Sequence, residues 1–175
     1  MNPFAELTPP IQNRPVTNLS SRQLASLLDA PPETSAAGVR DRALLQLLSE
    51  GLSLPQIYNL DLTYVDLDAH SLTVCMRDGN QELFILLDAT WVKLQRWLII
   101  RKLFAMSTDA VFLSLHWTDG RARPGSRLSE RGMRAIVTKY LVQIGVKQAG
   151  VNSSLITKSA HTQHNKIPHS LGEIP

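Results

Sequence analysis

The sequence predicts an α+β fold that is mainly α-helical and contains a small antiparallel β-sheet. Two patterns support this fold class: apolar residues recur at helical spacing in several segments, and they alternate at the strand period on both sides of Asp78-Gly79. The length of 175 residues, 43% of them hydrophobic, suffices for one domain with a core. We therefore expect a linker-like leader at 1–18, one domain at 19–150 and an irregular tail at 151–175.

The first expected helix follows the leader, whose four prolines favour an extended chain. Ser20 stands where an N-cap is needed, and Gln23 three residues later completes a capping box. Leu19 and Leu24 occupy the positions of a hydrophobic staple. The helix should end near Asp29, before two prolines.

A helical hairpin is expected next. Val39, Ala43, Leu44, Leu47 and Leu48 have the spacing of one helix face. A glycine at 51 ends that helix, and the Ser-Leu-Pro sequence at 53–55 starts a second helix that runs through residue 60.

Strands are predicted at 65–76 and 81–87, joined by a tight turn at Asp78-Gly79. A helix follows at 89–104, and its two tryptophans, Trp91 and Trp97, are interpreted as core residues rather than as a base-stacking platform.

Three further segments complete the expected domain. Residues 109–115 should form a short strand or an extended piece, and 116–126 a loop. A last helix at 128–146 should open at Ser129 and turn its basic side chains outward.

Composition excludes several classes of protein. The single cysteine, Cys75, cannot form an internal disulfide or a paired-thiol metal site, so a reducing, cytoplasmic setting is expected. No apolar run approaches the roughly 20 residues that cross a bilayer, and no export signal is visible. A zinc site at His161, His164 and His169 is disfavoured because the sequence near them offers no thiol or carboxylate. We expect no metal, no cofactor and no small-molecule substrate.

The charge is distributed unevenly along the chain. Residues 115–168 hold nine basic and two acidic side chains, a net charge of +7, whereas residues 1–114 hold nine basic and twelve acidic side chains, a net charge of −3. A polyanion-binding segment has this pattern, because each phosphate contact needs a local cation. The alternative is a solvated basic face without a partner. The predicted DNA-binding residues are Arg121, Arg123, Arg127, Arg131, Arg134 and Lys139.

Six segments in this order resemble the catalytic domain of the tyrosine recombinases, the phage-integrase and Xer-like group. They are LSSRQLASLLDAP, RDRALLQLL, EGLSLPQIYNLDLTYVDLDAHSLTV, RDGNQELFILL, VFLSL and RLSERGMRAIVTKYL. The resemblance covers about residues 2–146. It implies a protein that binds DNA, in which a tyrosine attacks a phosphodiester, two arginines neutralise the phosphoryl oxygens, and a hairpin lysine and histidines transfer protons.

The positions that the resemblance assigns to catalysis are degenerate in this chain. Ser53 stands at the place of the first arginine, and Asp78 at the place of the hairpin lysine. The motif Pro-His-x-Leu-Arg-His is matched only through Leu171, so that His169 is kept but Gly172 replaces the second arginine. The nucleophilic tyrosine is implied beyond Pro175, and the three tyrosines at 58, 64 and 140 stand in earlier contexts that do not fit this role.

Three hypotheses for function follow. The first is a DNA-binding protein of the recombinase family that is catalytically inactive, a relic of a mobile element. The second is an active recombinase subunit complemented by a partner chain, either a second copy or a full-length recombinase. The third is an interaction module or a pseudogene product.

Overall fold

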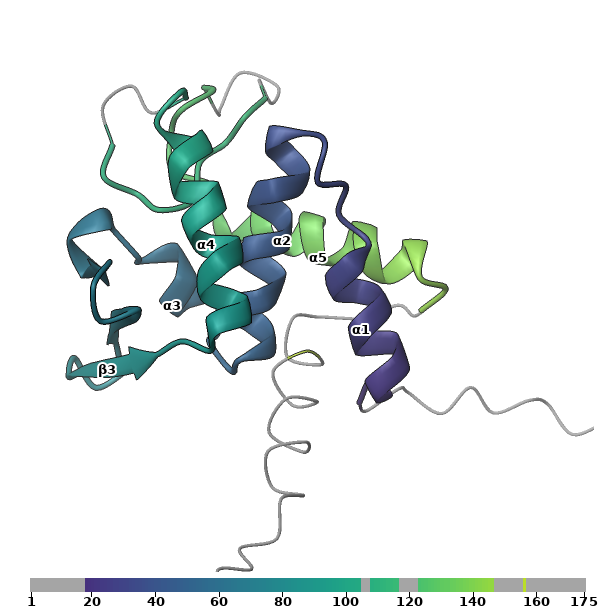
Figure 1. Cartoon of the computed structure of the whole chain (residues 1–175), viewed down its shortest axis with the longest axis horizontal. Helices are drawn as coiled ribbons and strands as arrows, with labels where there is room; N and C mark the ends of the chain where they lie inside the picture. Colours follow the sequence, from purple (N-terminus) through teal and green to yellow (C-terminus); the bar gives the residue numbers. More distant parts are fainter. Residues whose placement is uncertain (1–17, 105–107, 117–122, 147–155, 157–175) are drawn as a thin grey trace, which may run out of the picture.

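The computed structural model describes residues 18–104, 108–116, 123–146 and 156. The predicted leader up to residue 17, Arg121 and nearly all of the predicted tail lie outside the described residues. The architecture is the predicted one, helices packed around a central helix with a small antiparallel sheet at one side (Figure 1). No helix among the described residues is long and apolar enough to span a bilayer.

Helix α1 (Ser21–Asp29) confirms the predicted capping box. The Ser20 hydroxyl accepts the N–H of Gln23 at 3.2 Å, and the Gln23 side chain accepts the N–H of Ser20 at 3.0 Å. Leu19 and Leu24 are both buried in the core, as the predicted staple requires.

Helix α2 (Ala36–Ser49) is the central element. It contacts α1, α4 and α5 as well as the short helix α3, and in Figure 1 it lies between α4 in front and α5 behind. Its N-cap is Ser35, whose hydroxyl accepts the N–H of Gly38 at 3.1 Å. Gly38 is needed for close packing, because a Cβ there would lie 1.8 Å from the carbonyl oxygen of Pro32.

The elbow after α2 forms as the sequence predicts. Gly51 has a φ of 109°, which an L side chain rarely adopts, so a glycine suits this position. Helix α3 (Leu54–Tyr58) then begins with Ser53 as its N-cap and ends two residues earlier than predicted.

The predicted strand at 65–76 is divided in two. β1 (Val65–Asp66) and β2 (Ser71–Cys75) are separated by a turn in which the Asp66 carboxylate accepts the N–H groups of Asp68 and Ala69 at 3.0 and 2.8 Å. β3 (Gln81–Ile85) pairs with β2, so the antiparallel order is β1-β2-β3, and a 3₁₀ turn, η1 (Leu62–Tyr64), precedes the sheet.

Helix α4 (Asp88–Arg101) turns both tryptophans inward, which confirms the core interpretation. Trp91 and Trp97 are 4% and 0% exposed, and the Trp97 indole N–H donates to the carbonyl oxygen of Val111 at 2.9 Å. The segment 110–114 is buried and forms two isolated bridges, Asp61 with Ala110 and Leu113 with Arg127, so of the two forms predicted for 109–115 it is the extended piece and not the strand.

Helix α5 (Glu130–Gln143) opens at Ser129 as predicted, since its hydroxyl accepts the N–H of Gly132 at 3.1 Å. Its inner face is buried at Met133, Ile136, Val137, Tyr140 and Leu141. Ile156, which belongs to the predicted tail, is fully buried in the same core, so the core includes at least one residue beyond 150.

Candidate nucleic-acid interface

Helix α5 carries the predicted basic side chains on its solvent face. Arg131, Arg134 and Lys139 are all exposed, because they alternate with the buried positions at helical spacing. Arg134 lies 3.2 Å from Glu130, one turn earlier, in an exposed ion pair. The Lys139 ammonium lies 4.6 Å from the centre of the Tyr140 ring and remains at the surface. Arg131, Arg134 and Lys139 together form the α5 basic face.

Arg127 differs from the α5 basic face. Its guanidinium donates to the carbonyl oxygen of Tyr58 at 2.6 Å, forms an ion pair with Asp61, and lies 5.5 Å from the centre of the Tyr58 ring. Its charge is therefore already balanced, and the residue joins the segment before α5 to the end of α3. Arg123 is exposed, whereas the predicted Arg121 lies outside the described residues.

Ser53, at the first degenerate catalytic position, is occupied with capping α3. The Gln56 side-chain oxygen accepts both the backbone N–H of Ser53 at 2.8 Å and its hydroxyl at 2.7 Å. The Gln56 amide donates in turn to the sulfur of Met76 on the hairpin at 3.3 Å. Ser53, Gln56 and Met76 are thus neutral side chains that bond one another, and none of them carries the positive charge that the resemblance implies at this position.

Asp78, at the second degenerate position, lies exposed in the hairpin turn. Its carboxylate accepts the backbone N–H of Asn80 at 3.0 Å and the Asn80 side-chain amide at 2.7 Å. These bonds stabilise the turn, in which Gly79 has a φ of 87°. The neighbouring Arg77 is exposed. The turn therefore presents a carboxylate at the position where the resemblance implies a lysine.

Tyr140 is buried and cannot act as an exposed nucleophile. Its hydroxyl donates to the Asp41 carboxylate at 3.0 Å, and burial, followed by the charge of Asp41, raises the pKa of the phenol. Tyr58 lies half-buried beneath Arg127, and Tyr64 is half-buried in η1. The remaining degenerate positions, His169 and Gly172, lie outside the described residues.

A buried polar network at the centre of the domain escaped the sequence analysis. The Arg40 guanidinium pairs with Asp41 at 2.6 Å and donates to the carbonyl oxygen of Leu113 at 3.0 Å, while Asp41 also accepts the Tyr140 hydroxyl. The network joins α2, the segment 110–114 and α5. The available signal was an adjacent Arg-Asp pair between the apolar positions Val39 and Ala43 of a helix.

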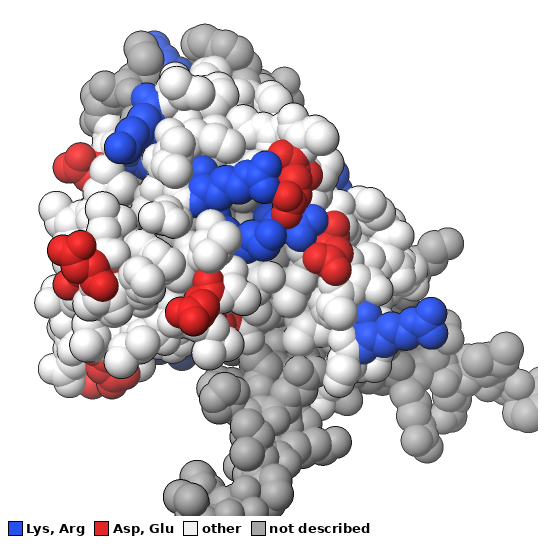
Figure 2. Space-filling model, viewed as in Figure 1, with Lys and Arg blue, Asp and Glu red and all other residues white. Residues whose placement is uncertain are grey.

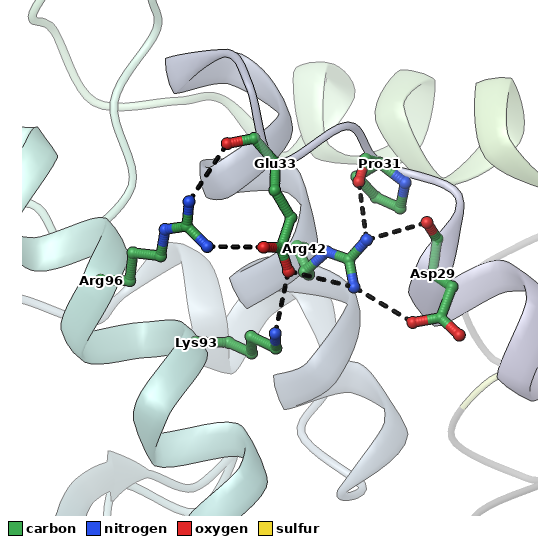
Figure 3. A network of polar contacts seen from close by, with 6 residues as sticks. All are labelled: Asp29, Pro31, Glu33, Arg42, Lys93 and Arg96. Carbon is green, nitrogen blue, oxygen red and sulfur yellow. Dashed lines mark hydrogen bonds and ion pairs between the residues drawn. The ribbon is translucent and has the colours of Figure 1, made fainter.

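A second cluster, also missed, lies on the α4 side of the molecule (Figures 2 and 3). The Glu33 carboxylate contacts Lys93 at 3.0 Å, Arg96 at 2.6 Å and Arg42 at 3.5 Å, and Arg42 also pairs with Asp29 at 3.1 Å. These cations, Lys93 first, hold the pKa of Glu33 at about 2. Since each of its three cations is already paired with Glu33 or Asp29, this cluster is a poorer surface for a polyanion than the α5 basic face.

In the described part of the chain, no three His, Cys, Asp or Glu side chains lie close enough together to hold a metal ion. The three histidines weighed as ligands, His161, His164 and His169, lie outside it.

Comparison with solved structures identifies the fold. The crystal structure of XerA recombinase superposes with a TM-score of 0.69 at 20% identity, covering 90% of this chain and 52% of the other. The XerH site-specific recombinase bound to its difH substrate, a pre-cleavage complex, superposes with a TM-score of 0.67 at 17% identity, covering 89% and 44%.

Comparison with known sequences identifies the family. Tyrosine recombinase XerC of Serratia marcescens is 37% identical over 134 residues, which are 75% of this chain and 37% of that protein. XerC of Shewanella amazonensis is 29% identical over 163 residues, 92% of this chain and 52% of that protein. The chain spans about half the length of these relatives or less. The model of the phage integrase family matches residues 17–165. The chain thus belongs to the phage integrase family, and it has the fold of a tyrosine recombinase catalytic domain.

Proposed function

We propose that this chain is a DNA-binding protein of the tyrosine site-specific recombinase family that does not cut DNA. The observation that carries the proposal is the α5 basic face, which offers exposed cations, whereas each cation of the Glu33 cluster is held in an ion pair with Glu33 or Asp29. Its role would belong to DNA recombination and integration. The bound partner would be the DNA backbone.

Phosphate is the group that these side chains suit best. Arginine and lysine at a helix surface donate charge-assisted hydrogen bonds to phosphate oxygens, and such contacts position a protein on DNA without reading its sequence. Arg131 and Lys139 are eight residues apart on α5, about 12 Å along the helix axis. That separation lets them contact different phosphates. The difH complex of the XerH neighbour supports the choice of DNA as the ligand.

The absence of catalysis is inferred from two positions inside the described chain. Ser53 is neutral and bonded to Gln56, so it cannot replace an arginine against the charge of a phosphoryl transition state. Asp78 carries a negative charge where the resemblance requires a lysine, and it would repel the phosphate.

The test is a fluorescence-anisotropy titration of a labelled DNA duplex at several salt concentrations. We expect binding at low salt that weakens as salt rises, with little preference for sequence. Arg131→Gln should weaken binding and lower the slope of log K against log salt by about 0.9, the value for one lost phosphate contact. The matched control is Arg22→Gln, since Arg22 is an exposed arginine on α1.

Two results would overturn the proposal. Absence of binding at low salt would contradict the proposal that this chain binds DNA. An equal loss in Arg22→Gln and Arg131→Gln would show a diffuse charge effect instead of contact at the α5 basic face. Cleavage is tested separately with a suicide duplex, and a covalent adduct would favour the complemented, active subunit.

A further inference from the structure

The outer edge of β3 is open among the residues that the structure describes. β3 pairs with β2 on one side only, and the ladder is bounded by the bonds from Met76 N–H to the Asn80 carbonyl and from Leu86 N–H to the His70 carbonyl. Hydrogen-bonded and non-hydrogen-bonded pairs alternate in an antiparallel ladder. Asn80, Glu82, Phe84 and Leu86 therefore direct their backbone groups to β2, whereas Gln81, Leu83 and Ile85 direct theirs to the open edge.

The side chains at this edge are apolar and exposed. Leu83 and Ile85 are 68% and 71% exposed, and they share one face of the strand because they are two residues apart. Natural edge strands are commonly guarded by lysine, proline or a bulge, and β3 has no lysine or proline and pairs with β2 without a bulge. Its single charged residue is Glu82, which projects from the opposite face.

We propose that β3 pairs with β3 of a second copy of this chain, in an antiparallel arrangement with a two-fold axis at Leu83. Leu83 would then stand opposite its own equivalent, and Gln81 opposite the partner's Ile85. Within the described part of the chain, nothing pairs with the N–H and C=O groups that these three residues direct to the open side, so each facing pair would exchange both hydrogen bonds. The two sheets would become one continuous sheet.

The choice of a second copy as the occupant follows from the self-complementarity of the strand. On one face, the two Leu83 side chains meet directly, and each lies diagonal to the partner's Ile85, so the four side chains form one apolar cluster. On the other face, Glu82 stands opposite the partner's Phe84. No like charges face each other directly, although the two Glu82 carboxylates lie diagonally, at about 7–8 Å.

The experiment is sedimentation velocity of the isolated protein over a range of concentrations, without DNA, so that it is independent of DNA binding. We expect a monomer–dimer equilibrium, which higher salt strengthens because it screens the Glu82 pair. Leu83→Lys should lower the association constant by at least about tenfold, since it places two lysines opposite each other.

Two further variants separate edge pairing from other causes. Leu83→Pro removes an N–H that points outward and not to β2, so it should abolish the dimer while circular dichroism shows the fold retained. Ile99→Lys is the matched control, because Ile99 on α4 is 63% exposed and lies on no sheet edge. It should leave association unchanged.

Three outcomes would overturn the proposal: a monomer at every concentration, an equal loss of association in Ile99→Lys and Leu83→Lys, or a dimer that persists in a folded Leu83→Pro.

Discussion

The hydroxyl of Tyr140 on α5 donates a 3.0 Å hydrogen bond to the carboxylate of Asp41 on α2. Both residues are buried, and Asp41 is also paired with Arg40. The α5 basic face is carried by the same helix, so this bond fixes the helix that we propose to contact DNA against the centre of the core. A buried bond of this kind is costly to break from one side, because the remaining partner cannot recover its hydration.

Tyr140→Phe should destabilise the domain. The substitution keeps the ring but leaves one oxygen of Asp41 without its donor, so the free energy of unfolding should fall by about 1–3 kcal/mol. Urea denaturation measures this change. Tyr64→Phe, which removes the hydroxyl of the half-buried Tyr64 in η1, is the control and should cost less than about 0.5 kcal/mol. Equal effects of the two variants would contradict the role of the network.

Asp41→Asn should cost more than Tyr140→Phe. The Arg40 guanidinium is buried, and Asp41 is its only ion-pair partner among the described residues, so the substitution removes its counter-ion. Breaking a buried pair from one side destabilises by about 3–5 kcal/mol. In chemical denaturation, the free energy of unfolding should therefore be highest for the unmodified protein, lower for Tyr140→Phe and lowest for Asp41→Asn. The reverse order would mean that Arg40 finds another partner or reaches water.

Gly38→Ala tests the close packing of α2. A Cβ at Gly38 meets the backbone oxygen of Pro32, which cannot move independently, so we expect a loss of about 1–3 kcal/mol. Gly132→Ala on α5 is the control, because its Cβ meets the end of the flexible Leu128 side chain at 2.8 Å, and alanine favours the helix. Thermal unfolding should show a lower melting temperature for Gly38→Ala than for Gly132→Ala. A harmless Gly38→Ala would contradict the packing described.

The Glu33 cluster predicts a dependence of stability on pH. The folded-state pKa of Glu33, about 2, lies below its usual 4.5, so the charged carboxylate stabilises the fold above pH 4.5. That contribution should be lost as the pH falls from 4.5 towards 2. Comparison of Glu33→Gln with the unmodified protein by urea denaturation should show a constant difference at neutral pH that disappears in acid. A difference independent of pH would contradict the ion-pair account.

Local signals in the sequence predicted the helices well. The capping box of Ser20 and Gln23, the elbow at Gly51 and the cap at Ser129 each involve residues within four positions of one another, and the structure forms all of them. The sequence was less informative where tertiary contacts, or hydrogen bonds from a side chain to the backbone, determine the secondary structure. Asp66 interrupts a continuous alternating pattern because its carboxylate accepts the backbone N–H groups of Asp68 and Ala69. For the segment 110–114, the alternation alone could not decide between a strand and the extended piece that forms.

The candidate site was predicted less completely. The outward positions of Arg131, Arg134 and Lys139 follow from helical periodicity alone. The pairing of Arg127 with Asp61 and the bond between Asp41 and Tyr140 join residues 66 and 99 positions apart. No periodicity relates residues at such separations, so a sequence pattern could not assign these side chains to structural roles.

The central claim, DNA binding without cleavage, is tested most directly by one gel-shift experiment on a suicide duplex. The protein is mixed with the duplex at low salt, and each sample is divided and run with and without a denaturing detergent. We predict a shifted complex that raised salt dissociates and that leaves no detergent-resistant species. A covalent adduct that survives the detergent, or the lack of any complex at low salt, would contradict this account.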